Sequence, residues 1–296
     1  MLKNLISIDE LSIDDCRKIF AYADNFILNP NSDELKNHKL INLFFENSTR
    51  TRSSFEFAAK NMGAEVINID VSTSALKKGE SEIDTIKTLT AMKPDFITIR
   101  HSVAGFVEKL SRFTNAHVIN SGDGSREHPT QALLDCFTIM KYKTKIEGLN
   151  IGICGDIINS RVARSNIKLL AKLGARIFLI APHSLMPNKL KIANVEFCYD
   201  LKSVIDKLDV LMTLRIQKER MKNAVITSEE EYGRFFGLNA NNLVNAKKDL
   251  IILHPGPINR EVEISSKIAD SESSLILNQV ANGIAIRQSV LKFLNN

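Results

Sequence analysis

The sequence contains few cysteines, and they form no recognisable motif. Only four are present, and no two of them make a CxxC pair. This arrangement indicates neither a disulfide framework nor a cysteine-based zinc site, and it is typical of proteins in a reducing cytoplasm. Cys136 and Cys154 stand in apolar surroundings, so we expect both to be small buried side chains.

Long apolar runs are also missing. No segment approaches the roughly 20 consecutive apolar residues that a membrane span requires. The first residues, MLKNLISIDEL, lack the continuous apolar segment of a signal peptide. We therefore expect a cytoplasmic protein that does not enter a membrane.

Charge of one sign is not concentrated in any part of the chain. The net charge is +5 over 296 residues, and the basic residues are scattered among acidic ones. Nucleic-acid-binding proteins more often carry Lys and Arg in one stripe, so we do not expect a nucleic-acid partner. A mild positive excess suits an enzyme whose substrates are anions.

Cofactor motifs are absent as well. The stretch NIGICGDIINSR follows a strand-like run, but Gly152 and Gly155 are spaced GxxG and no third glycine completes the dinucleotide fingerprint. Ser160 and Arg161, which come next, suit a carboxylate better than a dinucleotide. No HExxH, paired-cysteine or His–carboxylate metal pattern is present. We expect neither a metal nor an organic cofactor.

Apolar, β-branched runs of strand length alternate with amphipathic segments of helix length. Continuous rather than alternating apolarity predicts strands covered on both faces, and the strand–helix order predicts parallel sheets. The expected strands are 40–45, 65–70, 95–100, 116–120, 150–155, 176–181, 195–199, 209–215 and 250–255. The expected helices are 50–63, 80–92, 103–114, 130–143, 160–173, 200–208 and the final segment 277–296.

The length and one break in the pattern predict two α/β domains, each a parallel sheet flanked by helices. A chain of 296 residues can bury two cores, and the segment 130–143 is followed by a charged turn and a new strand. The final segment is apolar at helical spacing and is expected to return to the first domain. We therefore assign 1–131 plus 280–296 to the first domain and 132–279 to the second.

Polar and cationic residues follow many of the expected strands. In open parallel sheets, ligands bind beyond the carboxyl ends of the strands, which predicts one active-site cleft between the two domains. The clusters are NSTRTR after 40–45, RH after 95–99, SGDGSREHPTQ after 116–120, RIQKER after 209–214 and HPGPINR after 250–253.

The first of these clusters, STRTR, begins an expected helix. Unpaired N–H groups and the helix dipole favour an anion there. The planar guanidinium of Arg50 can also donate hydrogen bonds to two phosphate oxygens. The alternative is an ordinary helix cap by Ser48 or Thr49 with solvated arginines. Further cationic clusters behind other strands favour phosphate, with Arg50 in the binding role and Arg52 in a structural one.

Together these motifs resemble the catalytic chains of the aspartate carbamoyltransferases, and they lie in the family's order from residue 40 to residue 264. STRTR and HPTQ are shared with the ornithine carbamoyltransferases and indicate only carbamoyl phosphate. The ornithine enzymes carry a cysteine in an HCLP motif, whereas this chain has HPGP at 254–257 and LRIQKER from Leu214. The motifs that carry the resemblance are FFENSTRTRSSFE, KKGESEIDT, GDGSREHPTQALLD, DIINSRVARSN, MTLRIQKER and HPGPINREVEI.

The resemblance implies roles in the first domain. Ser48, Thr49, Arg50 and Thr51 would hold the phosphate of carbamoyl phosphate. Donors on Thr51, Arg100 and His128 would point at the carbamoyl oxygen, and Gln131 would accept from the carbamoyl amide. The structural alternative for His128 is a buried histidine without a catalytic part.

In the second domain the resemblance implies binding of L-aspartate. Arg161, Arg215 and Gln217 would bind the aspartate carboxylates, with the backbone of Pro255 and Gly256 near the reacting amine. The alternative for RIQKER is a charged helix start with i,i+4 ion pairs. Glu46 would pair with Arg161 and Arg220 to hold the closed form together.

The family also implies a shared active site. Ser74 and Lys78 would reach the active site of a neighbouring subunit in a homotrimer, and Lys78 would also contact aspartate. Without the resemblance, STSALKKGES is a solvated polar loop. The sequence does not decide whether regulatory chains join the trimer.

The expected activity is the transfer of a carbamoyl group from carbamoyl phosphate to L-aspartate, as in the first committed step of pyrimidine synthesis. One alternative is transfer to another amine such as ornithine, which would require acidic residues where Arg161 and Arg215 stand. A second alternative is a non-catalytic anion-binding protein on the same fold.

Overall fold

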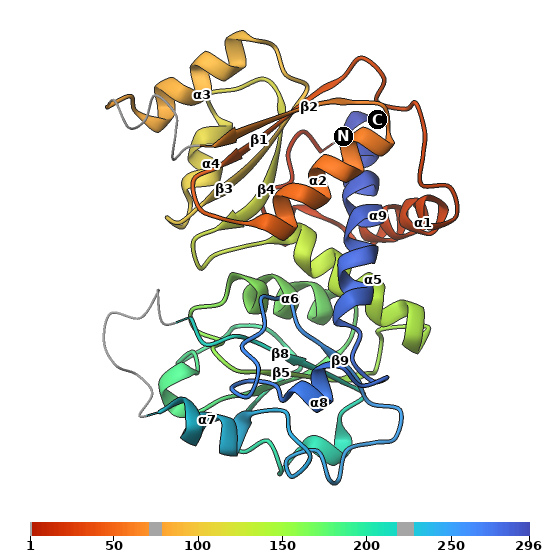
Figure 1. Cartoon of the computed structure of the whole chain (residues 1–296), viewed down its shortest axis with the longest axis vertical. Helices are drawn as coiled ribbons and strands as arrows, with labels where there is room; N and C mark the ends of the chain where they lie inside the picture. Colours follow the sequence, from red (N-terminus) through yellow and green to blue (C-terminus); the bar gives the residue numbers. More distant parts are fainter. Residues whose placement is uncertain (1, 71–78, 218–227) are drawn as a thin grey trace. The chain divides into compact units, whose positions relative to one another are not determined.

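The structure is a computed structural model that describes residues 2–70, 79–217 and 228–296. It divides into two compact units, Met1–Leu134 with Val280–Asn296 and Asp135–Gln279. The division falls within two helices, α5 (Pro129–Lys143) and α9 (Ile276–Asn295). Each unit is built on a parallel sheet flanked by helices, which confirms the predicted α/β class (Figure 1).

Unit 1 contains a four-stranded parallel sheet of order β2-β1-β3-β4. The central run of β1 is buried because helices cover both faces of the sheet, as its unbroken apolarity predicts. The strands are β1 (Lys39–Phe44), β2 (Glu65–Asp70), β3 (Phe96–His101) and β4 (His117–Asp123). The helices are η1 (Ile8–Glu10), α1 (Ile13–Leu28), α2 (Thr49–Asn61), α3 (Glu82–Ala91) and α4 (Phe106–Ser111).

The C-terminal helix α9 packs on unit 1 beside α1 and α2 (Figure 1). The Arg287 guanidinium lies 5.2 Å from the centre of the Phe55 ring of α2. Lys292 Nζ forms a 2.7 Å ion pair with Glu34 and lies 4.9 Å from the centre of the Tyr22 ring of α1. Neither α9 nor any other helix within the described ranges is long and apolar enough to cross a membrane.

Unit 2 contains a five-stranded parallel sheet of order β7-β6-β5-β8-β9. Its strands are β5 (Asn150–Cys154), β6 (Arg176–Ile180), β7 (Val195–Cys198), β8 (Val210–Thr213) and β9 (Ile251–Leu253). Its helices are α6 (Arg161–Lys172), η4 (His183–Leu185), η5 (Ile205–Lys207), α7 (Glu229–Phe236) and α8 (Ser266–Ala269). The strand β5 lies at the centre of the sheet, so the loop after it faces the ends of two neighbouring strands.

The prediction of a helix over 200–208 is wrong. Only η5 forms there, although the buried residues of the segment follow helical spacing. Asp200 explains the difference because its side chain accepts from the Lys202 N–H at 3.1 Å, and its carbonyl accepts from Ser203 Oγ at 2.8 Å. These local bonds offer the backbone a turn in place of a helix.

The four cysteines are free and buried, so we predict that the native chain resists thiol reagents. Burial raises the pKa of the Cys154 thiol to about 12 and that of the Cys198 thiol to about 11. The reactive form is the thiolate, which neither residue forms near pH 8. Titration with a coloured disulfide reagent should find four reactive thiols in urea, and fast reaction of two or more in the native chain would contradict the prediction.

The same pKa shifts predict a pH effect on stability. The ordinary cysteine pKa is 9.0, so between pH 9 and about 12 the unfolded chain releases the Cys154 proton while the native chain retains it. Unfolding then releases a proton, and the free energy of unfolding must fall as the pH rises through this window. Urea unfolding at pH 8 and pH 10 should show a smaller loss for Cys154→Ser than for the unaltered chain.

Candidate active site

Three adjacent strands of unit 1 bring the predicted carbamoyl-phosphate residues to one edge of the sheet. The end of β1 pairs with β3 in register, Phe44 opposite Arg100. The strand β3 in turn pairs with β4, His101 opposite Asp123. The segments that follow these strands carry Ser48 to Thr51 and His128, so the residues predicted from separate motifs share the carboxyl edge.

The start of α2 has the properties of an anion site. Ser48 is the N-cap residue but makes no side-chain capping bond, and no acidic residue lies in the first turn. The cap expected from Ser48 as the alternative interpretation is therefore not formed, and the first N–H groups of the helix keep their capacity to donate. Thr51 is buried, and it lies within the first turn of the helix.

Arg50 lies in this first turn with its side chain exposed to solvent. Partial removal of the guanidinium from water lowers the pKa of Arg50 from its ordinary value. Among the residues that the structure describes, none forms an ion pair with Arg50. A guanidinium partly removed from water is stabilised by an anion, which adds to the field of the helix N-terminus.

Arg100 is held in place by groups of its own unit. Its Nε lies 2.8 Å from Glu46 Oε1, and its Nη1 donates to the carbonyl of Ser121 at 3.4 Å. The sequence did not predict that Glu46 pairs with Arg100. The expected pairing of Glu46 with Arg161 involves a residue of unit 2, and Arg220 lies outside the described residues, so that pairing stays a prediction.

His128 lies at the start of α5, next to Pro129 in the first helical position. Its carbonyl accepts the N–H groups of Gln131 at 3.0 Å and Ala132 at 3.3 Å. Proline is favoured at this position because its missing N–H would have no helical partner. The side chains of His128 and Gln131 are buried, at 3% and 8% exposure. The turn therefore fixes both predicted carbamoyl contacts on one short, ordered segment.

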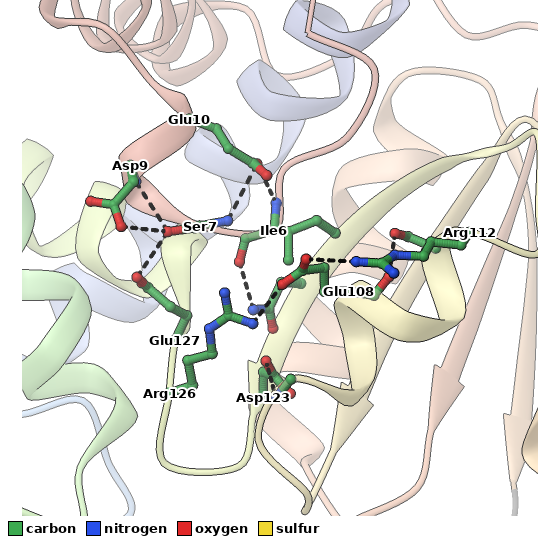
Figure 2. A network of polar contacts seen from close by, with 12 residues as sticks. Ile6, Ser7, Asp9, Glu10, Glu108, Arg112, Asp123, Arg126 and Glu127 are labelled. Atoms are coloured by element: carbon green, nitrogen blue, oxygen red, sulfur yellow. Dashed lines mark hydrogen bonds and ion pairs between the residues drawn. The ribbon is translucent and has the colours of Figure 1, made fainter.

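The loop that carries His128 is held by polar contacts from three neighbouring segments (Figure 2). Arg126 Nη1 lies 2.7 Å from Glu108 Oε2 of α4, and this hydrogen bond lowers the pKa of Glu108. Ser7 Oγ donates to Glu127 Oε1 at 3.0 Å, and the N–H of Gly105 donates to Asp123 Oδ2 at 3.0 Å. Sequence reasoning did not identify this network because its partners are distant along the chain.

Gly124 gives a prediction about this loop. Its φ is +51°, and a Cβ there would overlap the backbone nitrogen of Ala104 and lie 2.8 Å from Ala104 Cα. Alanine at 124 should lower the free energy of unfolding by about 3 kcal/mol, the sum of left-handed strain and backbone overlap. The test is urea unfolding together with the steady-state rate, which should fall because the His128 loop shifts.

Gly148 provides the matched control for that substitution. Its φ is +79°, but nothing lies within 4 Å of the position a Cβ would take. Gly148→Ala should cost only the left-handed strain, roughly 1–2 kcal/mol. Equal losses of stability in the two variants would show that the contact with Ala104 is unimportant.

The predicted aspartate residues of unit 2 also share one edge of a sheet. Arg161 begins α6 after β5, Arg215 and Gln217 follow β8, and Pro255 with Gly256 follows β9. The strands β5, β8 and β9 are consecutive neighbours in the sheet. The three motifs are therefore brought together as the parallel topology predicts.

Asp156, which the sequence analysis did not single out, connects two of these segments. Its Oδ2 accepts the N–H of Gln217 at 3.0 Å, and its Oδ1 accepts from Asn159 Nδ2 at 2.9 Å. The carboxylate is fully buried. Asp156 thus joins the loop that leads to Arg161 with the segment after β8. Its carboxylate accepts hydrogen bonds from the protein, so we assign it a structural role and not a role in ligand binding.

Arg161 is buried, at 4% exposure, at the first position of α6. Ser160 caps this helix, with its Oγ accepting the N–H of Ala163 at 3.1 Å. Arg215 and Gln217 are partly buried. Guanidinium groups bind carboxylates with two parallel hydrogen bonds, so Arg161 and Arg215 suit a substrate with two carboxylates.

Three residues given a role in the sequence analysis fall outside the described part of the chain. Ser74 and Lys78, expected to reach a neighbouring subunit, lie in the segment 71–78, and Arg220 lies in 218–227. Within the described ranges, no group of three His, Cys, Asp or Glu side chains could hold a metal ion.

Both halves of the chain match one protein family. Residues 3–141 match "Aspartate/ornithine carbamoyltransferase, carbamoyl-P binding domain", and residues 147–294 match "Aspartate/ornithine carbamoyltransferase, Asp/Orn binding domain". The chain therefore belongs to the aspartate/ornithine carbamoyltransferase family and is a carbamoyltransferase. The resemblance inferred from the motifs is confirmed.

Individual relatives identify the aspartate branch. The chain is 49% identical to the aspartate carbamoyltransferase catalytic subunit of Granulibacter bethesdensis, over 97% of this chain and 93% of that one. It is 49% identical to the catalytic subunit of Pelagibacter ubique, over 98% and 95%. Aspartate transcarbamoylase from Trypanosoma cruzi, solved with carbamoyl aspartate and phosphate, superposes with a TM-score of 0.90 at 30% identity, covering 98% and 94%.

Proposed function

We propose that the chain transfers the carbamoyl group of carbamoyl phosphate to the α-amino group of L-aspartate. The products are N-carbamoyl-L-aspartate and phosphate, as in de novo pyrimidine (UMP) biosynthesis. The relatives and the ligands of the T. cruzi structure support this reaction. The observation that carries it is the cationic and hydroxyl edge of each sheet, one suited to a phosphate and the other to carboxylates.

The start of α2 binds the phosphate in this proposal. Ser48, Thr49 and Thr51 supply hydroxyl and backbone donors, and Arg50 supplies a bidentate cation. The uncapped helix start and the lowered pKa of Arg50 support this role.

The carbamoyl carbonyl is polarised by Thr51, Arg100 and His128, and its amide donates to Gln131. Attack by an amine builds negative charge on the carbonyl oxygen, and fixed donors stabilise that charge. The hydrogen bonds that hold Arg100 and the turn at His128 support a site that needs little rearrangement.

L-Aspartate is bound by Arg161, Arg215 and Gln217, with the backbone of Pro255 and Gly256 near its amine. A cationic substrate such as ornithine would require a free acid at this edge. Asp156, a described acid at this edge, is buried and accepts hydrogen bonds from the protein through both oxygens. This arrangement favours a dicarboxylate.

The reaction requires no protein nucleophile. The amine nitrogen forms a bond to the carbonyl carbon, the bond from that carbon to the phosphate oxygen breaks, and the leaving phosphate takes the amine proton. Carbamoyl phosphate binds first and completes the pocket for aspartate, so the protein contributes proximity and charge stabilisation. If His128 were the base, His128→Ala would remove the low-pH limb of the pH–rate profile, where the base is protonated.

The active form is a cytoplasmic homotrimer with shared sites, in which Ser74 and Lys78 act on a neighbouring subunit. The unpaired cysteines support a reducing compartment, and the relatives are named catalytic subunits. Light scattering should give three times the 33.1 kDa chain mass. Mixing inactive Lys78→Ala with inactive Arg50→Ala should restore activity if sites are shared, and no recovery would contradict sharing.

A steady-state assay with separate amine substrates tests the reaction. Carbamoyl phosphate with L-aspartate should release phosphate and give N-carbamoyl-L-aspartate, identified by mass spectrometry. Turnover with L-ornithine but not L-aspartate would overturn the assignment. Phosphate binding without any product would favour the non-catalytic alternative.

A further inference from the structure

His254, the residue before the Pro255–Gly256 turn, is hydrogen-bonded through its backbone and both ring nitrogens. Its N–H donates to Gln279 Oε1 at 2.9 Å. Its Nε2 lies 3.0 Å from Glu263 Oε1, and its Nδ1 accepts the N–H of Gly256 at 2.8 Å. The side chains of His254 and Glu263 are both fully buried.

These partners determine the tautomer of His254. The backbone N–H of Gly256 can only donate, so Nδ1 must carry the lone pair. The proton of the neutral ring then resides on Nε2, where it is donated to the Glu263 carboxylate. The imidazole can accept from the turn only in this form, because a second proton on Nδ1 would displace the Gly256 N–H.

The bond to Gly256 also determines the direction of a carbonyl. The peptide that joins Pro255 to Gly256 is trans, so its N–H and its C=O point in opposite directions. Because the N–H of Gly256 points at the His254 ring, the Pro255 oxygen must point away from the ring. A carbonyl oxygen fixed in this way is an acceptor for an N–H of an amine.

The ring itself is held by further buried bonds. Glu263 Oε1 also accepts the N–H of Asn259 at 2.6 Å, so one carboxylate spans the turn. Gln279 donates to Asp135 Oδ1 at 2.7 Å, and Asp135 Oδ2 accepts from Asn166 Nδ2 at 2.8 Å. Hydrogen bonds to charged groups away from water are strong and directional, which restricts rotation of the ring.

We propose that His254 is a positioning residue that aims the Pro255 carbonyl at the attacking amine of the second substrate. The inference rests on the proposed function, because it assigns a partner to the amine of aspartate. Glu263 selects the ring tautomer, Gln279 fixes the backbone at 254, and the ring fixes the peptide between Pro255 and Gly256. No part of His254 touches the substrate.

Two substitutions at His254 separate this role from general packing. Asparagine places its Oδ1 near the former Nδ1 and retains an acceptor for Gly256, while it loses the contact with Glu263. Glutamine retains a donor toward Glu263 but has no acceptor near Nδ1. Asparagine removes more volume than glutamine, so general packing predicts the larger loss for His254→Asn, whereas the proposal predicts the larger loss of aspartate binding for His254→Gln.

The expected result is a split between the two Michaelis constants. His254→Gln should raise KM for aspartate roughly 10-fold, the effect of one misdirected hydrogen bond, and leave KM for carbamoyl phosphate within about twofold. His254→Asn should stay within about threefold for both substrates. Equal shifts of the aspartate KM in the two variants, or parallel shifts of both constants, would overturn the proposal.

A spectroscopic measurement covers the case in which one of the two variants does not fold. Nitrogen NMR of the unaltered chain labelled with 15N-histidine, with the His254 signal assigned by its loss in His254→Gln or His254→Asn, should show that ring protonated at Nε2 only. That signal should change in Glu263→Leu, which removes the acceptor. A His254 ring protonated at Nδ1 would contradict the proposal, whereas absence of turnover with aspartate in the unaltered chain would contradict only the proposed reaction.

Discussion

Alanine at position 50 is expected to lower kcat/KM for carbamoyl phosphate by roughly 10³-fold, the range for losing two charge-assisted hydrogen bonds to a phosphate. Arg50 lies in the first turn of α2, which contains no acidic residue and whose N-cap Ser48 makes no side-chain capping bond. Without the guanidinium, a phosphate would retain only the helix N–H groups and hydroxyls. Steady-state kinetics with carbamoyl phosphate as the varied substrate provide the measurement.

Arg52 is the matched control for this experiment because it lies on the same helix two residues away. Its charge acts on Glu56, whose pKa is lowered chiefly by hydrogen bonds from Lys60 and Asn68 and also by the nearby Arg52. Arg52→Ala should therefore keep kcat/KM within about tenfold, a surface-charge effect. Equal losses in both variants, at unchanged melting temperature, would show that Arg50 has no special role in phosphate binding.

Alanine at position 128 is expected to reduce kcat by roughly 100- to 1000-fold, the typical effect of losing one oxyanion donor. The His128 side chain is buried on the turn that begins α5, and the turn holds it at a fixed place. The donor acts on charge that develops during attack, and KM for carbamoyl phosphate should change little. The pH–rate profile should retain its shape because the leaving phosphate takes the proton.

His183 offers a comparison for the His128 substitution. Its ring is exposed and stacks on Tyr199 at 3.8 Å between ring centres. His183→Ala should leave kcat within about twofold, as expected of a surface substitution. A loss of the low-pH limb of the profile in His128→Ala, at retained binding, would instead make His128 the general base.

The parallel sheets and the edges that carry the candidate residues could be predicted from the sequence. Apolar runs such as LINLFF predict β1, and residues directly after such runs must lie at the carboxyl edge whatever the details of the loops. Arg50, His128 and Arg161 were identified in this way, with their roles supplied by family resemblance. Pattern and motif both act over a few residues, which is why single sequences reveal them.

The contacts that hold these residues in place could not be predicted in the same way. Glu127 bonds to Ser7, and Asp156 bonds to Gln217, across long stretches of chain. Glu46 pairs with Arg100, whereas the family resemblance implies Arg161 and Arg220 as the partners of Glu46. Such pairs depend on how strands are ordered in the folded sheet, and no local spacing rule encodes them. The helix expected over 200–208 failed for a local reason, the turn-forming bonds of Asp200.

A competition between two amines in one tube tests the central claim most directly. Carbamoyl phosphate labelled with 13C is mixed with equal concentrations of L-aspartate and L-ornithine, and carbon NMR follows the label after addition of the chain. The arginines after β5 and β8 favour a substrate with two carboxylates. We therefore expect the label to pass to N-carbamoyl-L-aspartate and not to citrulline. Label that passes mainly to citrulline, or stays in carbamoyl phosphate apart from spontaneous decay, would contradict the account.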